Sequence, residues 1–144
     1  MPYDITGWIE VLWDHTLEEE KKVWSGVICL DRLSLADEYE TSVLFGLAKR
    51  PVNNPLFAER GVPSDCSEAV DREVKENEAF IKKHGEGNFG FTHALWSEIS
   101  PRLKEIEREE QISDDWNQVF DLAKVLEKTK FHPDWIRFVL WANW

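Results

Sequence analysis

The stretch YDITGWIEVLW, residues 3–13, alternates between two kinds of side chain along most of its length. Ile9 and Val11 fall on one face of an extended chain, whereas Thr6 and Glu10 fall on the other. A repeat of two residues is that of a β-strand, because successive side chains point to opposite faces of a sheet. We therefore expect a strand with one buried face and one mixed face, as in an antiparallel sheet.

Four further segments predict strands. The segment VWSGVICLDRL, residues 23–33, is apolar on both faces and rich in β-branched residues, which favours a central strand. YETSVLFGLA, residues 39–48, predicts a strand that ends near Gly46. FGFTHALW, residues 89–96, alternates bulky with small side chains, and DWIRFVLWANW, residues 134–144, is an apolar strand that ends the chain. A last strand paired inside the sheet would tie down the C-terminus.

Three helices are expected, each with a start or stop signal. The first covers residues 65–83 and is stopped by Gly85, which can take the left-handed position after a helix. The second covers residues 100–110, because serine followed by proline favours a helix start. The third begins at Ser113 or Asp114 and repeats its apolar residues with a period of 3.6.

The order of these elements predicts an α+β fold. We expect a mostly antiparallel sheet of about four to six strands, with about three helices packed on one face. A length of 144 residues favours a single domain, residues 1–144. The hydrophobic content of 42%, with eight Trp and eight Phe, is enough for an aromatic-rich core that needs no covalent staples.

The net charge of −11 narrows the classes of partner. A negative field repels phosphate at long range, so we expect neither nucleic acid nor an anionic membrane as a partner, although a local basic pocket stays open. Cys29 lies in the apolar run VICL and is expected to be a buried thiol, and the two cysteines predict no disulfide framework. Without a leader segment or an apolar stretch of membrane-spanning length, the sequence predicts a cytoplasmic protein.

The segment KRPVNNPLFAERGVPSDCSE, residues 49–68, is long and irregular, and such segments in compact domains are usually functional or disordered. Its prolines fix backbone angles, its PLFA should anchor it, and Arg60-Gly61 leads to a helix N-terminus suited to an anion. The structural alternative is a surface crossover held by its prolines, with Arg60 bonding backbone carbonyls. The candidate ligand-binding residues are Arg50, Asn53, Asn54, Phe57, Arg60, Gly61, Asp65, His93 and Trp96.

Each candidate has an expected role. Arg50 and Arg60 would engage phosphate, Gly61 would allow close backbone approach, and Phe57 or Trp96 would stack on a base. His93 would read a polar edge or act as a general base, or it is a histidine satisfied within the sheet. The sequence holds no metal-ligand spacing, nucleotide-binding glycine motif or defensible nucleophile, so we expect no metal, no cofactor and no catalytic residue.

A resemblance rests on the segments YDITGWIEV, LFG, PLFAERGVPSDCS, FTHALWSEI and IRFVLWANW. Together they are similar to a group of small proteins from bacteriophages and bacterial genomes that have no established activity. The resemblance implies that Arg60, Gly61, Pro63 and Asp65 belong to the motif of the group. A phage setting implies a counter-defence role in the host cytoplasm, through sequestration of a nucleotide signal or through blocking of a host protein.

The leading functional hypothesis is non-enzymatic binding of a small phosphate-bearing, nucleotide-like ligand, such as a nucleotide immune signal. The first alternative is an acidic interaction module that blocks a basic host protein. The second alternative is a hydrolase that uses His93 with an acidic partner. Trp135, Trp141 and Trp144 crowd the last strand, and their burial between copies is compatible with a homodimer or a higher oligomer.

Overall fold

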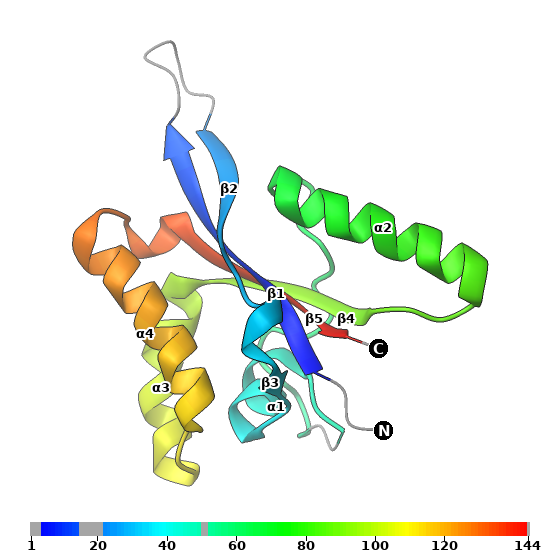
Figure 1. Ribbon diagram of the computed structural model, residues 1–144. Helices are drawn as coiled ribbons and strands as arrows, with labels where there is room; N and C mark the ends of the chain where they lie inside the picture. The colour runs from blue at the N-terminus through cyan, green and yellow to red at the C-terminus, as the bar shows by residue number, and fades with distance from the viewer. Residues whose placement is uncertain (1–3, 15–21, 50–51, 144) are drawn as a thin grey trace.

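The computed structural model describes residues 4–14, 22–49 and 52–143. Within them the chain forms five strands, β1 (Asp4–Asp14), β2 (Lys22–Cys29), β3 (Leu35–Ala36), β4 (Phe89–Leu95) and β5 (Ile136–Asn143). It also forms four α-helices, α1 (Tyr39–Phe45), α2 (Glu68–His84), α3 (Trp96–Glu109) and α4 (Asp114–Thr129), and two 3-10 helices, η1 (Asp31–Leu33) and η2 (Pro133–Trp135). The α+β class with an antiparallel sheet is confirmed (Figure 1).

The sheet has the order β2-β1-β5-β4, with β3 paired to the start of β1. The last strand, β5, lies between β1 and β4 as predicted, because residues 136–142 are all buried. The prediction that residues 23–33 form a central strand is wrong, since β2 lies at the sheet edge. The apolar side chains of Val23 and Val27 are exposed there, so they did not signal a strand buried on both faces.

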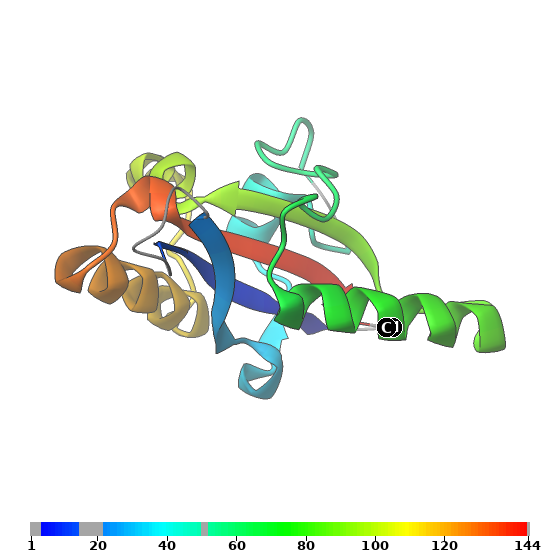
Figure 2. The same cartoon turned by 90° about the horizontal axis from the view of Figure 1, so that it is seen from above.

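The two faces of the sheet are covered differently (Figures 1 and 2). The helices α1, α3 and α4 pack on one face, where Ile9, Phe138 and Phe120 belong to the main core. The helix α2 lies on the opposite face, where Val70 packs with Val139 in a second, smaller cluster. Three helices thus share one face, but α2 is not among them.

The prediction of a strand over residues 39–48 is wrong, because this segment contains α1. The Oγ1 atom of Thr41 accepts a hydrogen bond from the N–H of Glu38 at 2.9 Å, which caps the helix start. Gly46 ends the helix with a left-handed φ of 66°. The glycine that we took as the end of a strand is therefore the cap of a helix.

Two helix starts differ from expectation. The cap of α2 is Ser67 and not Asp65, since the Oγ atom of Ser67 accepts a hydrogen bond from the N–H of Val70 at 3.3 Å. The helix α3 begins at Trp96, so Pro101 lies inside it and not in its first turn. The carboxylate of Glu98 accepts a hydrogen bond from the N–H of Leu95 at 3.0 Å, which supports the earlier start.

The other helix signals are confirmed. Ser113 caps α4 by accepting a hydrogen bond from the N–H of Trp116 at 3.4 Å, and Gly85 follows α2 with a φ of 81°. Cys29 is exposed, contrary to the expectation of a buried thiol, because it ends the edge strand. No helix in the described part of the chain is long and apolar enough to cross a membrane.

Candidate functional site

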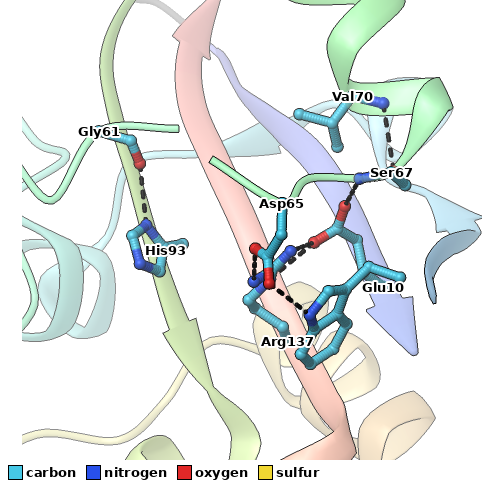
Figure 3. Close-up of polar contacts among 8 residues, drawn as sticks. Glu10, Gly61, Asp65, Ser67, Val70, His93 and Arg137 are labelled. Atoms are coloured by element: carbon cyan, nitrogen blue, oxygen red, sulfur yellow. Dashed lines mark hydrogen bonds and ion pairs between the residues drawn. The ribbon is translucent and has the colours of Figure 1, made fainter. Parts of the chain in front are cut away.

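Residues 60–67, which we call the strap, cross the sheet face that carries α2. At β4 the N–H of Gly61 donates to the carbonyl of Phe91 at 2.9 Å. At β1 the N–H of Ser67 donates to the carboxylate of Glu10 at 2.6 Å (Figure 3). The strap thus leads from β4 over β5 to β1, and it sets the point at which α2 begins.

A guanidinium lies under the middle of the strap. Arg137 of β5 is only 5% exposed, and its Nε atom donates to Oε1 of Glu10 at 2.7 Å. Its Nη1 atom donates to Oδ1 of Asp65 at 2.8 Å (Figure 3). Its Nη2 atom lies 2.7 Å from the same Glu10 oxygen without an aligned hydrogen bond, so that contact is electrostatic only. The Trp24 ring stacks on the guanidinium at 3.9 Å and donates its N–H to Asp65 at 3.1 Å.

The charge of Asp65 is stabilised by this arrangement. Partial burial alone would raise the pKa of Asp65, but the hydrogen bond and the charge of Arg137 outweigh burial and hold the pKa below its usual value. Asp65 is ionised at neutral pH, and its contact with Arg137 keeps it ionised to a lower pH than usual, although its side chain is only 65% exposed. Two carboxylates, Glu10 and Asp65, surround one guanidinium, so this centre does not attract a further anion.

The first residue of the strap is also paired within the chain. Both terminal nitrogens of Arg60 donate to the Glu98 carboxylate at 2.9 Å, and the guanidinium lies 4.7 Å from the centre of the Phe57 ring. The hydrogen bond from Arg60 lowers the pKa of Glu98 below its usual value. Such two-pronged contact with a carboxylate is the geometry in which a guanidinium binds most strongly. The guanidinium of Arg60, which we expected to bind a phosphate, thus binds the carboxylate of Glu98 instead.

Gly61 and His93 do meet, as the sequence hypothesis required, but they bind each other. The Nδ1 atom of His93 lies 2.9 Å from the Gly61 carbonyl (Figure 3). A carbonyl only accepts hydrogen bonds, so Nδ1 carries the proton, and Nε2 is the acceptor in the neutral ring. The N–H of Gly61 is already bound to Phe91, so the strap does not direct it at an anion.

The expected stacking residues are not available to a base. Trp96 is 1% exposed, its ring stacks on Phe138 in the core, and its N–H donates to Glu127 at 2.9 Å. Phe57 is buried as well. We therefore correct the stacking role of both residues, because their rings are part of the apolar core.

The remaining candidates lie on the first half of the segment. Asn53 and Asn54 are exposed, whereas Arg50 lies outside the described residues. Both asparagines line a hollow of about 390 Å³ beside α3, and Phe57 lines an adjoining hollow of about 310 Å³. We call the two hollows the α3 groove. Its lining residues are Tyr39, Val43, Val52, Asn53, Asn54, Leu56, Phe57, Ser97, Glu98, Pro101, Arg102, Glu105, Ile106 and Glu109.

The groove combines apolar side chains with negative charge. Leu56 is 41% exposed within it, and its described charged residues are three glutamates and Arg102. Close to its Tyr39 end, the pKa of Glu38 is raised by burial and then by the charges of neighbouring carboxylates. Those carboxylates are Glu40, Asp37, Glu110 and Asp115. This end of the molecule therefore carries a strongly negative potential.

Several side chains that organise the site were missed in the sequence. Glu10 lies in WIEVLW and Arg137 in WIRFVL, each the single charged residue of an apolar stretch. Buried charges are rarely found without a partner, so two such residues of opposite sign could have been matched. Glu98 carried no comparable signal, because it stands among many acidic residues of a helix.

Neither a metal site nor a similarity to known proteins points to a function. Among the described residues, no group of three or more histidine, cysteine, aspartate or glutamate side chains could hold a metal ion. We compared the chain with family models, with curated proteins and with solved structures, and none of them matches. The features that bear on its function are therefore the contacts, the exposed side chains and the charge of this chain.

Proposed function

We propose that this protein is a non-enzymatic interaction module that binds a basic, partly apolar segment of a partner protein in the α3 groove. One observation carries the proposal: the groove joins exposed apolar side chains to three glutamates and Arg102. Arg102 is itself paired with Glu105 at 3.3 Å and Glu98 is paired with Arg60 at 2.9 Å, so Glu109 supplies the excess negative charge of the groove.

The physical case has two parts. The exposed side chain of Leu56 and the half-buried side chain of Tyr39 supply the area whose burial stabilises a complex. The carboxylates around them, on a chain of net charge −11, select a cationic partner and speed its approach. A basic segment with a few apolar side chains satisfies both conditions. The resemblance to phage proteins fits a protein that blocks a basic host factor.

A phosphate-bearing, nucleotide-like ligand remains a prediction with less support. Arg60 would first have to leave Glu98, and the carboxylate would then face the phosphate. Across the strap, Arg60 and Arg137 supply two positive charges, whereas Glu10, Asp65 and Glu98 supply three negative ones. This excess of negative charge opposes the binding of an anion. A hydrolase that uses His93 as a general base would need an acidic partner bonded to its ring, and the Nδ1 atom of His93 is bonded to the Gly61 carbonyl instead.

Binding of a fluorescent peptide tests the proposal. The probe is a basic amphipathic peptide of lysine, arginine and leucine, and its acidic counterpart serves as the reference. We expect Leu56→Asp to weaken binding of the basic peptide about tenfold and Glu109→Lys about fivefold, because they remove an apolar anchor and reverse a charge in the groove. The acidic peptide should not bind.

Glu107→Lys is the matched control, since Glu107 is exposed on the same helix and does not line the groove. Its effect should stay below about twofold, because it changes only the overall charge. Equal losses for Glu107→Lys and Glu109→Lys would contradict a defined groove. A nucleotide that raises the melting temperature of the protein, but not of Arg60→Ala, would replace the proposal with the nucleotide-like ligand.

A further inference from the structure

The last turns of α2 extend beyond the sheet (Figures 1 and 2). Of the helix, only Val70 and Asn77 are buried. Phe80 and Ile81, in its distal half, are 49% and 38% exposed. Large apolar side chains on adjacent positions of a projecting helix form an apolar surface that the fold leaves uncovered.

A hollow of about 320 Å³ lies beside this surface, lined by Glu73, Glu76, Asn77, Phe80, Gly87, Asn88 and Asn143. Its wall is held in place by Asn77, whose side chain donates to the Asn88 carbonyl at 3.2 Å and accepts from the Asn88 N–H at 2.8 Å. Gly87 permits this close approach, because a Cβ atom there would come within 2.5 Å of the Asn77 side chain. The hollow is therefore formed before any partner arrives.

The charges of the exposed helix are distributed unequally along its length. The middle of α2 carries Glu73, Glu76 and Glu78 together with one basic residue, Lys75, which is paired with Asp71 at 2.8 Å, whereas its last turn carries Lys82 and Lys83. When two such helices cross antiparallel at Phe80, a residue three or four positions after Phe80 faces a residue three or four positions before Phe80 in the other helix. The basic end of one helix then meets the acidic middle of the other, twice, by symmetry.

We propose that the distal half of α2 is the interface through which two copies of this chain form a two-fold symmetric dimer. Phe80 of each copy enters the hollow of the other, and Lys83 of each copy pairs with Glu76 of the second copy. The occupant is a second copy because the surface is complementary to itself in charge and in shape, which a two-fold contact requires. This interface does not involve the α3 groove.

The two copies are expected to associate weakly through this surface. The contact is a few helix turns, and interfaces that bury less than about 1,200 Å² in total belong to weak or transient complexes. We expect a dissociation constant in the micromolar range by sedimentation velocity, measured over a wide range of protein concentrations in physiological salt. A chain that stays monomeric up to millimolar concentration would overturn the proposal.

Single substitutions locate the interface. Phe80→Asp should weaken association at least about tenfold, because it places a charge in the apolar centre of the contact. Val125→Asp is the matched control, since Val125 is 57% exposed on α4 and its replacement should leave the dimer intact. Phe80→Ala, which removes the ring without adding charge, should weaken association as well. Equal dimerisation of wild type and both Phe80 variants would refute the interface.

A charge swap tests the antiparallel arrangement. Lys83→Glu and Glu76→Lys should each weaken dimerisation several-fold, because each brings like charges together across the contact. The double variant K83E/E76K should restore dimerisation, since the pair is rebuilt with its signs exchanged. A double variant that dimerises no better than the single ones would overturn the proposed pairing.

Discussion

The two halves of the segment 52–67 lie a few residues apart in sequence, but one is bound to the sheet and the other is open to solvent. The second half, the strap, binds the sheet through charged groups that all have partners within the chain, among them Arg137 and Glu98. The first half, residues 52–57, lines the α3 groove and presents Leu56 and two asparagines to solvent. Richness in arginine, asparagine and proline therefore does not distinguish a binding loop from a structural one. The distinction depends on whether the polar groups are satisfied by the protein itself.

The largest loss of stability is expected from a substitution at Arg137, which holds the strap on the sheet. The substitution Arg137→Met leaves Glu10 as a buried carboxylate without a counter-charge, which we expect to lower the free energy of unfolding by about 3–5 kcal/mol. Urea unfolding followed by tryptophan fluorescence measures the loss. The double variant Glu10→Met/Arg137→Met should recover more than half of it, because no charge is then left unpaired. A loss below about 1 kcal/mol in the single variant would mean that this pair does not hold the strap.

Asp65 should give the next largest effect and a pH dependence. Its pKa is lower in the folded chain than in the unfolded one, so its contribution to stability is complete above the unfolded value of about 3.9. The contribution is lost as the pH falls through the folded pKa. Asp65→Asn should therefore cost about 1 kcal/mol at pH 7 and flatten the decrease in stability below pH 4. An unchanged acid slope in this variant would argue against the contact with Arg137.

Arg60→Ala should cost less, about 0.5–1 kcal/mol, because the pair with Glu98 is partly exposed and solvent screens it. Thermal unfolding at low and high salt measures this contribution, which should shrink as salt is added. Arg102→Ala is a matched control, since Arg102 has a more exposed pair with Glu105 on the same helix as Glu98. A larger cost for Arg102→Ala than for Arg60→Ala would reverse the ranking of the two pairs.

The smallest effect on stability should come from the groove. Leu56→Asp and Glu109→Lys should change the free energy of unfolding by less than about 0.5 kcal/mol, since both side chains are exposed. Both should weaken binding of the basic peptide, whereas Asp65→Asn should leave that binding unchanged. The free energy of unfolding and the affinity for the basic peptide should both be measured on these variants. A groove variant that lowered both quantities would contradict the division between a structural strap and a binding groove.

Much of the fold was predictable from local patterns. The alternation in YDITGWIEVLW predicted β1, the apolar C-terminal run predicted β5 in the middle of the sheet, and Gly85 and Ser113 marked a helix end and a helix start. The strand expected at residues 39–48 failed because a seven-residue helix is too short to show its period clearly.

The candidate site was predictable only in part. Asn53 and Asn54 lie in an open groove, and Gly61 does reach His93, but Trp96 and Phe57 are buried and Arg60 is paired with Glu98. A residue type shows which contacts a side chain can make. It does not show whether the fold has already supplied them.

Period, capping residues and composition act within a few residues of each other, so β1, β2, β4 and β5, the end of α2, the start of α4 and the α+β class could be inferred from the sequence alone. The face on which α2 packs, the pairing of Glu10 with Arg137 and the burial of Trp96 could not. Glu10 and Arg137 are 127 positions apart. Their contact depends on which strands become neighbours and on where the strap crosses them. Those are properties of the packed chain, because burial and electrostatic pairing are settled when distant segments exclude water together.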